Sequence, residues 1–480
     1  MKASAPILDK VPTFAGYGLL GSISALLGWS VWARGGTVVA LQGPLPWIGL
    51  VLLIFLLLDR WGSANSGRSL LRSLCGDVVF LAGLSFLVLL TVQWWNAGRH
   101  PYFHPFEQRW VFTPAAHPGW PWAVDPDEAA EMLRWFFPAW ALMLTLRHAR
   151  NTAWLAKRVA WFLVCNAGLL ALFGIAQTLS GTHQIFWLTP MSDHFFASFG
   201  YENHAASYFA LSFALAAGML LQGMQLSGPR VHAHGRRLVR GASATIAICA
   251  VLCLAGMALS FSRTGMALAV GLSGATLIVA ARLFWPRVSF AQRVAVVSAL
   301  IMGVATFFFV MASIGGVELV QKVALLPHAD VPHELNTRLF MVRSAGAMWL
   351  DNPWFGVGGW GYRHFLPLQA VAEHITLGPG DANVHNDAAQ FLCEFGAVGL
   401  GLMLAATLAF MWPLLRQARC HLTPGLALAG LGLLAVLFHS LLDLPFRSPG
   451  ILNAWLAVCG VAQVLTGCDA ARIPRPCLAK

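Results

Sequence analysis

The chain has 480 residues, of which 58% are apolar and only 11% are charged, and its formal net charge at pH 7 is +11. These proportions exclude a soluble globular fold, an intrinsically disordered chain and a disulfide-rich secreted scaffold, because none of these classes has such an apolar composition. The composition is typical of a protein whose main solvent is lipid.

Apolar segments long enough to cross a bilayer recur along the whole chain. A helix needs about 20 mostly apolar residues to span roughly 30 Å of hydrocarbon, and about twelve segments qualify. The weakest of them, Ala129–Leu146, carries Glu131 and Arg134 near its start. In chain order the segments are Val11–Ala33, Gly35–Leu58, Val78–Gly98, Ala129–Leu146, Val159–Ser192, Asn203–Pro229, Gly241–Ser262, Thr264–Ala281, Val294–Val317, Phe395–Leu415, Cys420–Leu442 and Ser448–Cys468. The sequence therefore predicts an all-α polytopic membrane protein with about twelve transmembrane helices.

The basic residues indicate how these helices are oriented. Cytoplasmic connections retain Lys and Arg, whereas translocated connections have few of them. If the N-terminus lies inside, about two thirds of the 31 Lys and Arg fall in inner segments and most of the 20 Asp and Glu fall in outer ones. Both termini are then expected to be cytoplasmic. No nucleic-acid partner is expected, since the basic residues are scattered over many short segments and form no patch.

Two outer regions are too long to be simple turns. The first, residues 96–128, is rich in Pro, Trp and His, and its aromatic residues are typical of side chains that anchor a helix at the membrane interface. The second, residues 316–394, separates the ninth predicted helix from the tenth. The predicted organisation is thus 1–315 with nine helices, a partly helical outer domain at 316–394, and 395–480 with three helices and a cytoplasmic tail.

The second outer region contains signals for helices and turns. Asn336 is a candidate cap for a helix that ends at the breaker Asp351-Asn352-Pro353. The glycine-rich run Gly356–Gly361 excludes a regular helix, and without a preceding strand it is a poor dinucleotide site. His385-Asn386-Asp387 is then expected to begin a helix that leads into the next span.

Ionisable residues beside an apolar span are costly, so each one is a candidate functional residue. Arg263 lies in the turn between two apolar helices, where the alternative interpretation is a snorkelling side chain. Arg338 opens the predicted outer helix, and His385 is one of 16 histidines. The chain has no CxxC or HExxH pattern, and His232 and His234 lie in a basic inner loop where solvation explains them better than a metal. No metal site is predicted.

Several of these segments together resemble the signature of the O-antigen ligase and polymerase superfamily. They are Phe199–Ala205, Ser262-Arg263-Thr264-Gly265, Thr337-Arg338, Asn352–Gly358, His385-Asn386-Asp387, Glu394-Phe395-Gly396 and His439–Asp443. The resemblance covers residues 190–445 in order, whereas the first third of the chain carries no such motif. It implies a membrane glycosyltransferase that moves a glycan from undecaprenyl diphosphate to an acceptor hydroxyl at the periplasmic face of a bacterial inner membrane.

The resemblance implies separate roles for three residues. Arg263 and Arg338 match the arginines of the family and are expected to bind the donor diphosphate, because guanidinium groups bind phosphate oxygens bidentately and stay charged when desolvated. His385 is expected to be the general base for the acceptor hydroxyl, since imidazole has a pKa of about 6.5 and is largely neutral outside the cell. The expected reaction is a single inverting displacement without a metal or another cofactor.

Four further outer residues are weaker candidates for the same site. Asn203 and His204 match a family motif at a helix start, although helix capping explains an Asn there equally well. Tyr362 and Arg363 follow the glycine-rich run, and they either line the cleft or face water.

The motifs around the tenth span supply three more candidates. Asn386 and Asp387 follow the expected base directly, and Asp387 is a possible orienting partner for it, although adjacent residues rarely pair side chain to side chain on a helix. Glu394 is expected to orient or cap a group near the span. Asp443 and Arg447 are expected to form a structural pair.

The resemblance leaves the acceptor open. Ligation of a polysaccharide onto lipid A core is the leading prediction, while polymerisation of another lipid-linked glycan and O-glycosylation of a protein hydroxyl are alternatives. The expected partners are the lipid-linked donor, one of these acceptors and membrane lipids. A transporter of lipid-linked sugars is a rival of a different class, but its ionisable residues would lie near mid-membrane, whereas here they cluster at one face.

Overall fold

The structure is a computed structural model that describes residues 13–61, 72–106, 108–191, 194–226, 233–284, 331–372, 382–420 and 422–462. These parts are mainly helical. The α-helices are α1 (Phe14–Trp32), α2 (Pro44–Trp61), α4 (Val78–Trp95), α5 (Pro126–His148), α6 (Thr152–Leu179), α7 (Glu202–Leu226), α8 (Ala233–Leu259), α9 (Arg263–Phe284), α11 (Val331–Asp351), α12 (Tyr362–Ala372), α13 (Asp387–Cys420), α14 (Pro424–His439) and α15 (Pro449–Ala462). Short 3-10 helices form at η1 (Arg34–Gly36), η2 (Val39–Leu41) and η4 (Pro445–Arg447).

Sheet structure in the described residues is limited to two small antiparallel pairs. β1 (Pro101–His104) pairs with β2 (Arg109–Phe112), with Pro101 opposite Phe112. β3 (Gln184–Ile185) pairs with β4 (Thr189–Pro190). Both pairs lie in connections between helices, so the prediction of an all-α membrane protein holds for the class of fold.

Eight of the described helices are long and apolar enough to cross a membrane, and α14 and α15 are shorter apolar helices. Helix α5 has 23 residues but is too polar to be counted among the eight. These helices coincide with the predicted apolar segments except Val294–Val317, which lies outside the described residues. The chain is a multi-pass membrane protein, and twelve spans stay a prediction.

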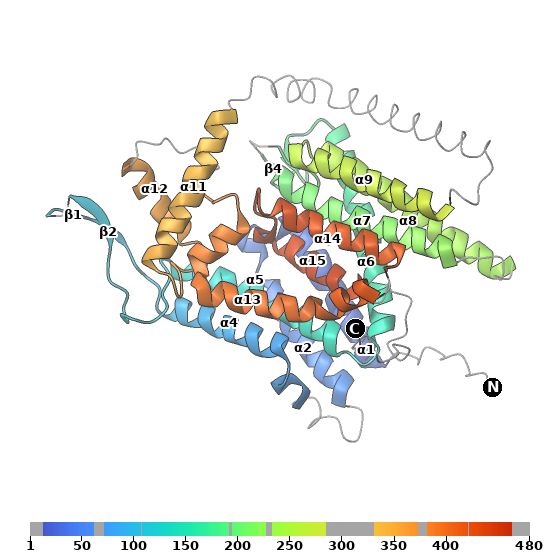
Figure 1. Ribbon diagram of the computed structural model, residues 1–480, viewed down its shortest axis with the longest axis horizontal. Helices are drawn as coiled ribbons and strands as arrows, with labels where there is room; N and C mark the ends of the chain where they lie inside the picture. Colours follow the sequence, from blue (N-terminus) through green and yellow to red (C-terminus); the bar gives the residue numbers. More distant parts are fainter. Residues whose placement is uncertain are drawn as a thin grey trace, which may run out of the picture.

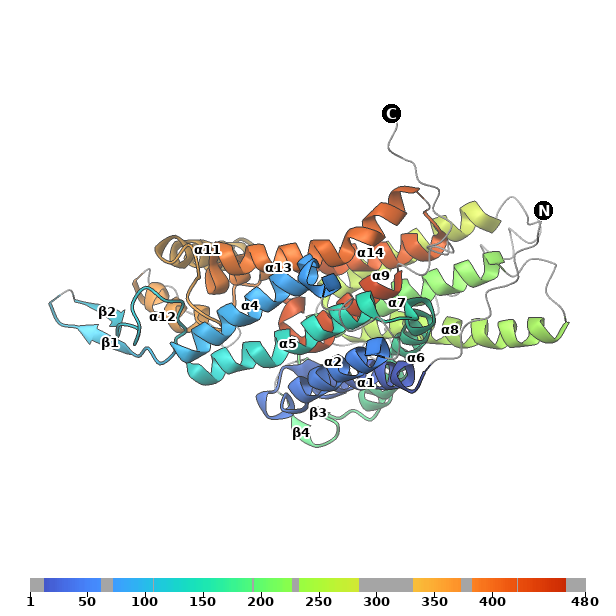
Figure 2. The ribbon, with the colours of Figure 1, turned by 90° about the horizontal axis from the view of Figure 1, so that it is seen from below.

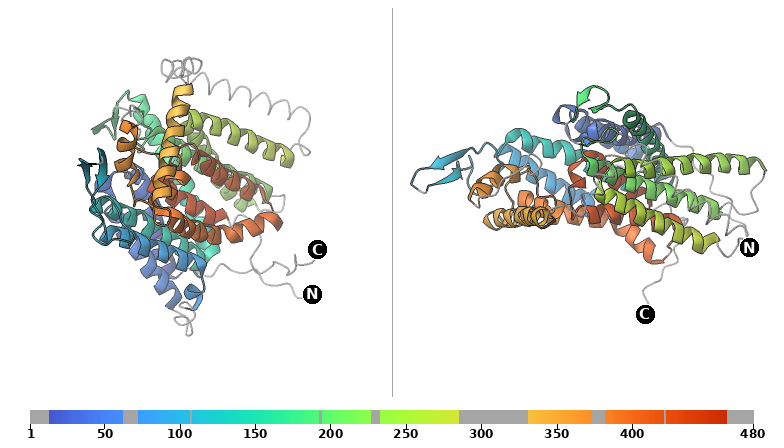
Figure 3. Two further views of the ribbon diagram at one scale, coloured as in Figure 1. Left: turned by 60° about the vertical axis from the view of Figure 1, so that its left-hand side comes forward. Right: turned by 90° about the horizontal axis from the view of Figure 1, so that it is seen from above.

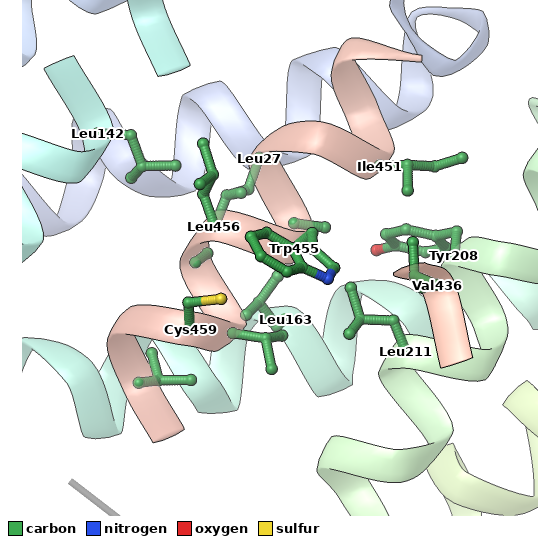
Figure 4. Close-up of a cluster of buried hydrophobic side chains, with 14 of the residues drawn as sticks. Leu27, Leu142, Leu163, Tyr208, Leu211, Val436, Ile451, Trp455, Leu456 and Cys459 are labelled. Atoms are coloured by element: carbon green, nitrogen blue, oxygen red, sulfur yellow. The ribbon is translucent and has the colours of Figure 1, made fainter. Parts of the chain in front are cut away.

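The helices run roughly along the longest dimension of the molecule (Figures 1 and 2). Helix α7 lies at the centre of the bundle and packs against α14 and α8, while α15 packs against α5, α1 and α6. Trp455 of α15 fills the space between these helices, among Leu211, Val436 and Leu456 (Figure 4). Its indole Nε1–H donates to the carbonyl of Leu433 at 3.1 Å, so the one polar atom of this large buried side chain has a partner.

The two long outer regions gather at one end of the bundle. The β1–β2 hairpin, α11 and α12 lie at this end, whereas the start of α8 and the end of α9 lie toward the other (Figures 1 and 3). The ring centroid of Phe365 lies 4.2 Å from that of Phe112 and 6.3 Å from that of Trp122. Phe112 and Trp122 therefore join the first outer region to the second, while anchoring at the membrane interface stays a prediction for the aromatic side chains of residues 96–128.

Helix α13 is interrupted at Gly396, where the backbone has a φ of 65°. The loop before α12 inserts its backbone into this break: Val357 N–H donates to Cys393 O at 3.0 Å, and Ala397 N–H donates to Pro353 O at 2.8 Å. A Cβ atom at Gly396 would lie 2.4 Å from the backbone nitrogen of Phe355, so only glycine fits. The segments Asn352–Gly358 and Glu394-Phe395-Gly396, which are separate motifs in the sequence, therefore contact each other through their backbones.

The predicted start of the outer helix was wrong and its end was correct. Helix α11 begins at Val331 and not after Asn336, so Asn336 is an interior residue and Arg338 does not open the helix. The helix ends at Asp351, where Pro353 prevents further helical hydrogen bonding.

Candidate functional site

A histidine and an aspartate from distant segments pair at the end of the bundle where α11 packs against α13. His385 lies two residues before the start of α13, and its Nδ1 lies 3.3 Å from Oδ1 of Asp443, in the connection after α14. The Asp443 side chain is 3% exposed and the His385 side chain 19% exposed. With Nδ1 facing the carboxylate, Nε2 is the ring nitrogen that can take a proton from another group.

His385 adopts a left-handed backbone conformation with a φ of 53°. Such a conformation costs a non-glycine residue of order 1–3 kcal/mol and persists only where the surroundings impose it. The next two residues impose it by docking onto the segment after α14: Asn386 Nδ2 donates to Leu441 O at 3.0 Å, and Asp387 N–H donates to Ser440 O at 2.9 Å. Asn386 also caps α13, because its Oδ1 accepts from Ala389 N–H at 2.9 Å.

Asp387 does not orient His385 as the sequence suggested. Its Oδ2 accepts from Phe446 N–H at 3.0 Å, so its carboxylate turns into the segment after α14. Asp443 takes the orienting place instead. The helical turn that begins at Asp387 directs neighbouring side chains away from one another.

Asp443 has further polar partners from the start of α7, from the residue before it and from its own loop. Tyr201 donates its hydroxyl proton to Oδ2 at 2.7 Å, Asn203 donates to the same oxygen, and Leu444 N–H donates to Oδ1 at 2.9 Å. Burial alone would raise the pKa of Asp443, but His385 and Tyr201 lower it below its ordinary value. The carboxylate is therefore ionised at neutral pH.

The same network reaches the start of α9. Ser262 donates its hydroxyl proton to Asn203 Oδ1 and accepts from Gly265 N–H at 3.0 Å, which caps the helix that Arg263 begins. The amide nitrogen and the amide oxygen of Asn203 are therefore both used in side-chain contacts, and Asn203 does not cap a helix. Through Asn203 and Ser262, Arg263 is placed next to the residues that hold Asp443.

Arg338 reaches the segment after α14 from the outer helix. Its Nη1 donates to Leu442 O at 2.7 Å, one residue before Asp443. His385 and Arg338 thus contact this segment directly, whereas Arg263 is linked to it through side chains of α7 and α8–α9. His385 and Arg338 therefore meet at this connection, and Arg263 follows Ser262, whose hydroxyl bonds to Asn203.

Two buried histidines, His204 and His439, stabilise the connection after α14 and the end of α14. His204 Nε2 lies 3.0 Å from Leu444 O, and His439 Nδ1 lies 2.7 Å from the hydroxyl oxygen of Ser207. Both histidines are buried. His204 is therefore a buried supporting residue of the connection after α14.

Tyr362 and Arg363 hold the outer region together. Tyr362 is fully buried in the apolar core of α11 and α12 and donates to Met341 O at 3.3 Å, so it neither lines a cleft nor faces water. Arg363 lies 3.3 Å from a carboxylate oxygen of Glu128 and 3.8 Å from the ring centroid of Trp360. This ion pair ties the start of α12 to the start of α5.

Glu394 and Arg447 form a buried ion pair, and the expected pairing of Asp443 with Arg447 was wrong. The Arg447 guanidinium also lies between two rings, 4.6 Å from the centroid of Trp360 and 5.0 Å from that of Phe391. Removing one partner of such a pair leaves an uncompensated buried charge, at a cost of about 3–5 kcal/mol. The pair joins α13 to η4 beneath the site.

Sequence reasoning missed the role of Asp443 and omitted Tyr201. Both residues stand in quoted motifs, Phe199–Ala205 and His439–Asp443, but nothing in one sequence shows that partners separated by 58 or 242 positions meet. In the part of the chain that the structure describes, no group of three or more His, Cys, Asp or Glu is arranged to hold a metal ion.

Comparison with known proteins adds an independent observation. No curated protein matches the chain. Residues 248–404, about a third of the chain, match a family model described as O-antigen ligase. The matched range includes Arg263, Arg338 and His385, while Tyr201 and Asp443 lie outside it. This match supports the resemblance to the O-antigen ligase and polymerase superfamily over the motifs from Ser262 to Gly396.

Proposed function

We propose that this membrane protein transfers a preassembled glycan from undecaprenyl diphosphate to an acceptor hydroxyl, with ligation onto lipid A core as the leading reaction. The observation that supports the proposal most strongly is the pairing of His385 with the buried Asp443, beside a segment that Arg338 also contacts. A general base, an orienting carboxylate and cations for an anionic leaving group are the parts that such a transfer needs.

His385 would act as the base. Its Nε2 takes the proton of the acceptor hydroxyl while the hydroxyl oxygen bonds to the anomeric carbon of the donor sugar. The bond from that carbon to the diphosphate oxygen breaks, and its electron pair stays with the diphosphate. Asp443 accepts from Nδ1–H throughout and stabilises the imidazolium that forms.

The two arginines would bind the diphosphate. Negative charge grows on the leaving group as the bond breaks, so fixed guanidinium groups favour the transition state over the ground state. The contact of Arg338 with Leu442 O uses one of the five guanidinium N–H groups and fixes the side chain. A base and a leaving group on opposite faces of the sugar would give inversion.

The proposed location is a bacterial inner membrane, with the site at the periplasmic face and both termini in the cytoplasm. The two outer regions lie at the same end of the bundle (Figure 2), and Arg338 belongs to α11 of the second region, which supports one-sided chemistry. A lipid diphosphate donor has its anionic head at this level and its tail in hydrocarbon.

Arg263→Ala and Arg338→Ala are each expected to weaken donor binding about tenfold or more and to lower turnover as well, because each removes a charged phosphate ligand. Donor affinity is measured with the protein in lipid nanodiscs. Arg282→Ala is the matched control, since Arg282 is an exposed arginine at the far end of α9, and affinity should not change. Unchanged donor affinity in Arg263→Ala or Arg338→Ala would show that the residue only snorkels.

Chelation of divalent cations is expected to leave the transfer rate unchanged, because the arginines supply the charge that a metal would otherwise provide. The rate is measured before and after EDTA treatment, and again after addition of Mg²⁺. A strict requirement for a divalent cation would contradict this assignment.

Reconstitution with a defined donor tests the function itself. Purified protein receives an undecaprenyl diphosphate glycan and, in separate reactions, lipid A core, a second lipid-linked glycan or a Ser- and Thr-containing protein. The acceptor that gains the mass of the glycan identifies a ligase, a polymerase or a protein glycosyltransferase. Movement of the intact donor across the bilayer without any glycosylated product would instead establish the transporter.

A further inference from the structure

The side-chain amide of Gln390, which lies about one turn into α13, hydrogen-bonds both residues that precede His385, Asn383 and Val384. Gln390 is fully buried, and its Oε1 accepts from Val384 N–H at 3.1 Å. Its Nε2 donates to Asn383 Oδ1 at 3.1 Å and to Glu394 Oε1 at 3.0 Å. Gln390 therefore fixes the two residues that precede the left-handed backbone conformation of His385.

The three contacts of Gln390 require a carboxamide. Val384 presents a donor, whereas Asn383 and Glu394 each present an acceptor oxygen. A carboxamide supplies one acceptor oxygen and two N–H donors in a fixed plane, so all three partners are satisfied at once. An apolar side chain of the same length would leave them unpaired, and buried unpaired polar groups are costly.

Glu394, the third partner of Gln390, is bound to the segment that carries Asp443. Glu394 is held by Arg447, which lies in η4, four residues after Asp443. Asn386 and Asp387 dock onto the same segment near its start. The segment that carries Asp443 is therefore joined to the start of α13 both before and after Asp443, and Gln390 links the second of these joints to the backbone next to His385.

We propose that Gln390, locked by the Glu394–Arg447 ion pair, is a positioning residue that holds the His385 ring against Asp443 for proton transfer. The inference rests on the proposed function, because it gives Gln390 a role only if His385 is the base. Gln390 itself is buried and touches neither donor nor acceptor. Its effect is exerted through the backbone of Asn383 to His385.

A double-mutant cycle separates positioning from general support of the fold. Gln390→Leu is expected to lower kcat about tenfold or more, with donor KM changed less than about threefold, because only the geometry of the base is lost. Combined with Asp443→Asn, it should add little further loss, since both changes disrupt the same pair. Gln390→Met, which keeps the length and flexibility of the side chain, is measured in parallel, and donor affinity shows that each variant is folded.

Gln222→Leu is the matched control. Gln222 is a buried glutamine that accepts from Gly425 N–H at 3.1 Å, about 30 Å along α7 from the site end at 1.5 Å per residue. Its loss should leave kcat unchanged. The positioning role would be overturned if a folded Gln390 variant kept its full kcat. It would also be overturned if the losses of Gln390→Leu and Asp443→Asn multiplied independently. In either case the proposed function would still stand, provided that His385→Ala is inactive. Full activity of His385→Ala would overturn the function, and the inference with it.

Discussion

Replacement of His385 by Ala is expected to reduce transfer about 1,000-fold or more, because general-base catalysis by a positioned side chain contributes about 100-fold to 10,000-fold. The lipid-linked donor should still bind, since its diphosphate is assigned to Arg263 and Arg338 and not to the imidazole. Single-turnover transfer and donor affinity are measured on the same preparation. Loss of turnover with retained affinity is the result expected of a base.

The chain offers a close control for this variant. His148 ends α5 at the other end of the bundle, and its Nε2 lies 2.6 Å from Oδ2 of Asp77, so it also forms a histidine–aspartate pair. His148→Ala is expected to keep its turnover. If His385→Ala transfers glycan as fast as His148→Ala, His385 is not the base.

Asp443→Asn is expected to lower kcat about 100-fold or more with a small change in donor KM, because the amide keeps the shape of the carboxylate but cannot stabilise an imidazolium. The pKa of Asp443 lies below its ordinary value of about 3.9, so the contribution of its charge to stability is complete above that pH and is lost as the pH falls. A loss measured at neutral pH therefore reports the missing charge and not a titration. kcat and KM are measured at pH 7 and above.

Asp77→Asn is the control for Asp443→Asn. Asp77 also accepts from a histidine, and it caps α4 through Oδ1 with Val79 N–H at 3.0 Å, a contact that asparagine can replace. This variant should keep its kcat. An Asp443→Asn protein that binds donor and turns over at the normal rate would show that the carboxylate has only a structural role.

Much of the fold was predictable because lipid imposes a simple length rule. Apolar segments of about 20 residues gave the membrane helices, and the breaker at Asp351–Pro353 gave the end of α11. The start of α11 was not predictable from Asn336, because a single capping residue type is weaker than the packing of the helix. The contact between the two outer regions was not predictable either, because it depends on aromatic pairs such as Phe112 with Phe365.

The site was predictable residue by residue but not pair by pair. The motifs named Arg263, Arg338 and His385, yet proximity in sequence suggested the wrong partners for two charged groups. Asp443 and Arg447 are four positions apart, a spacing that favours pairing on an α-helix, but a bend and the 3-10 helix η4 separate them. Asp387 is close to His385 in sequence, but the start of α13 turns it toward Phe446.

The most direct test of the central claim is to locate the donor head group on the protein. A lipid diphosphate with a photoreactive group beside the diphosphate is bound and activated, and the cross-linked peptides are identified by mass spectrometry. The account predicts cross-links in peptides that contain Arg263, Arg338 or the connection from Ser440 to Leu444. Cross-links confined to the other end of the bundle, such as residues 149–151 between α5 and α6, would contradict it.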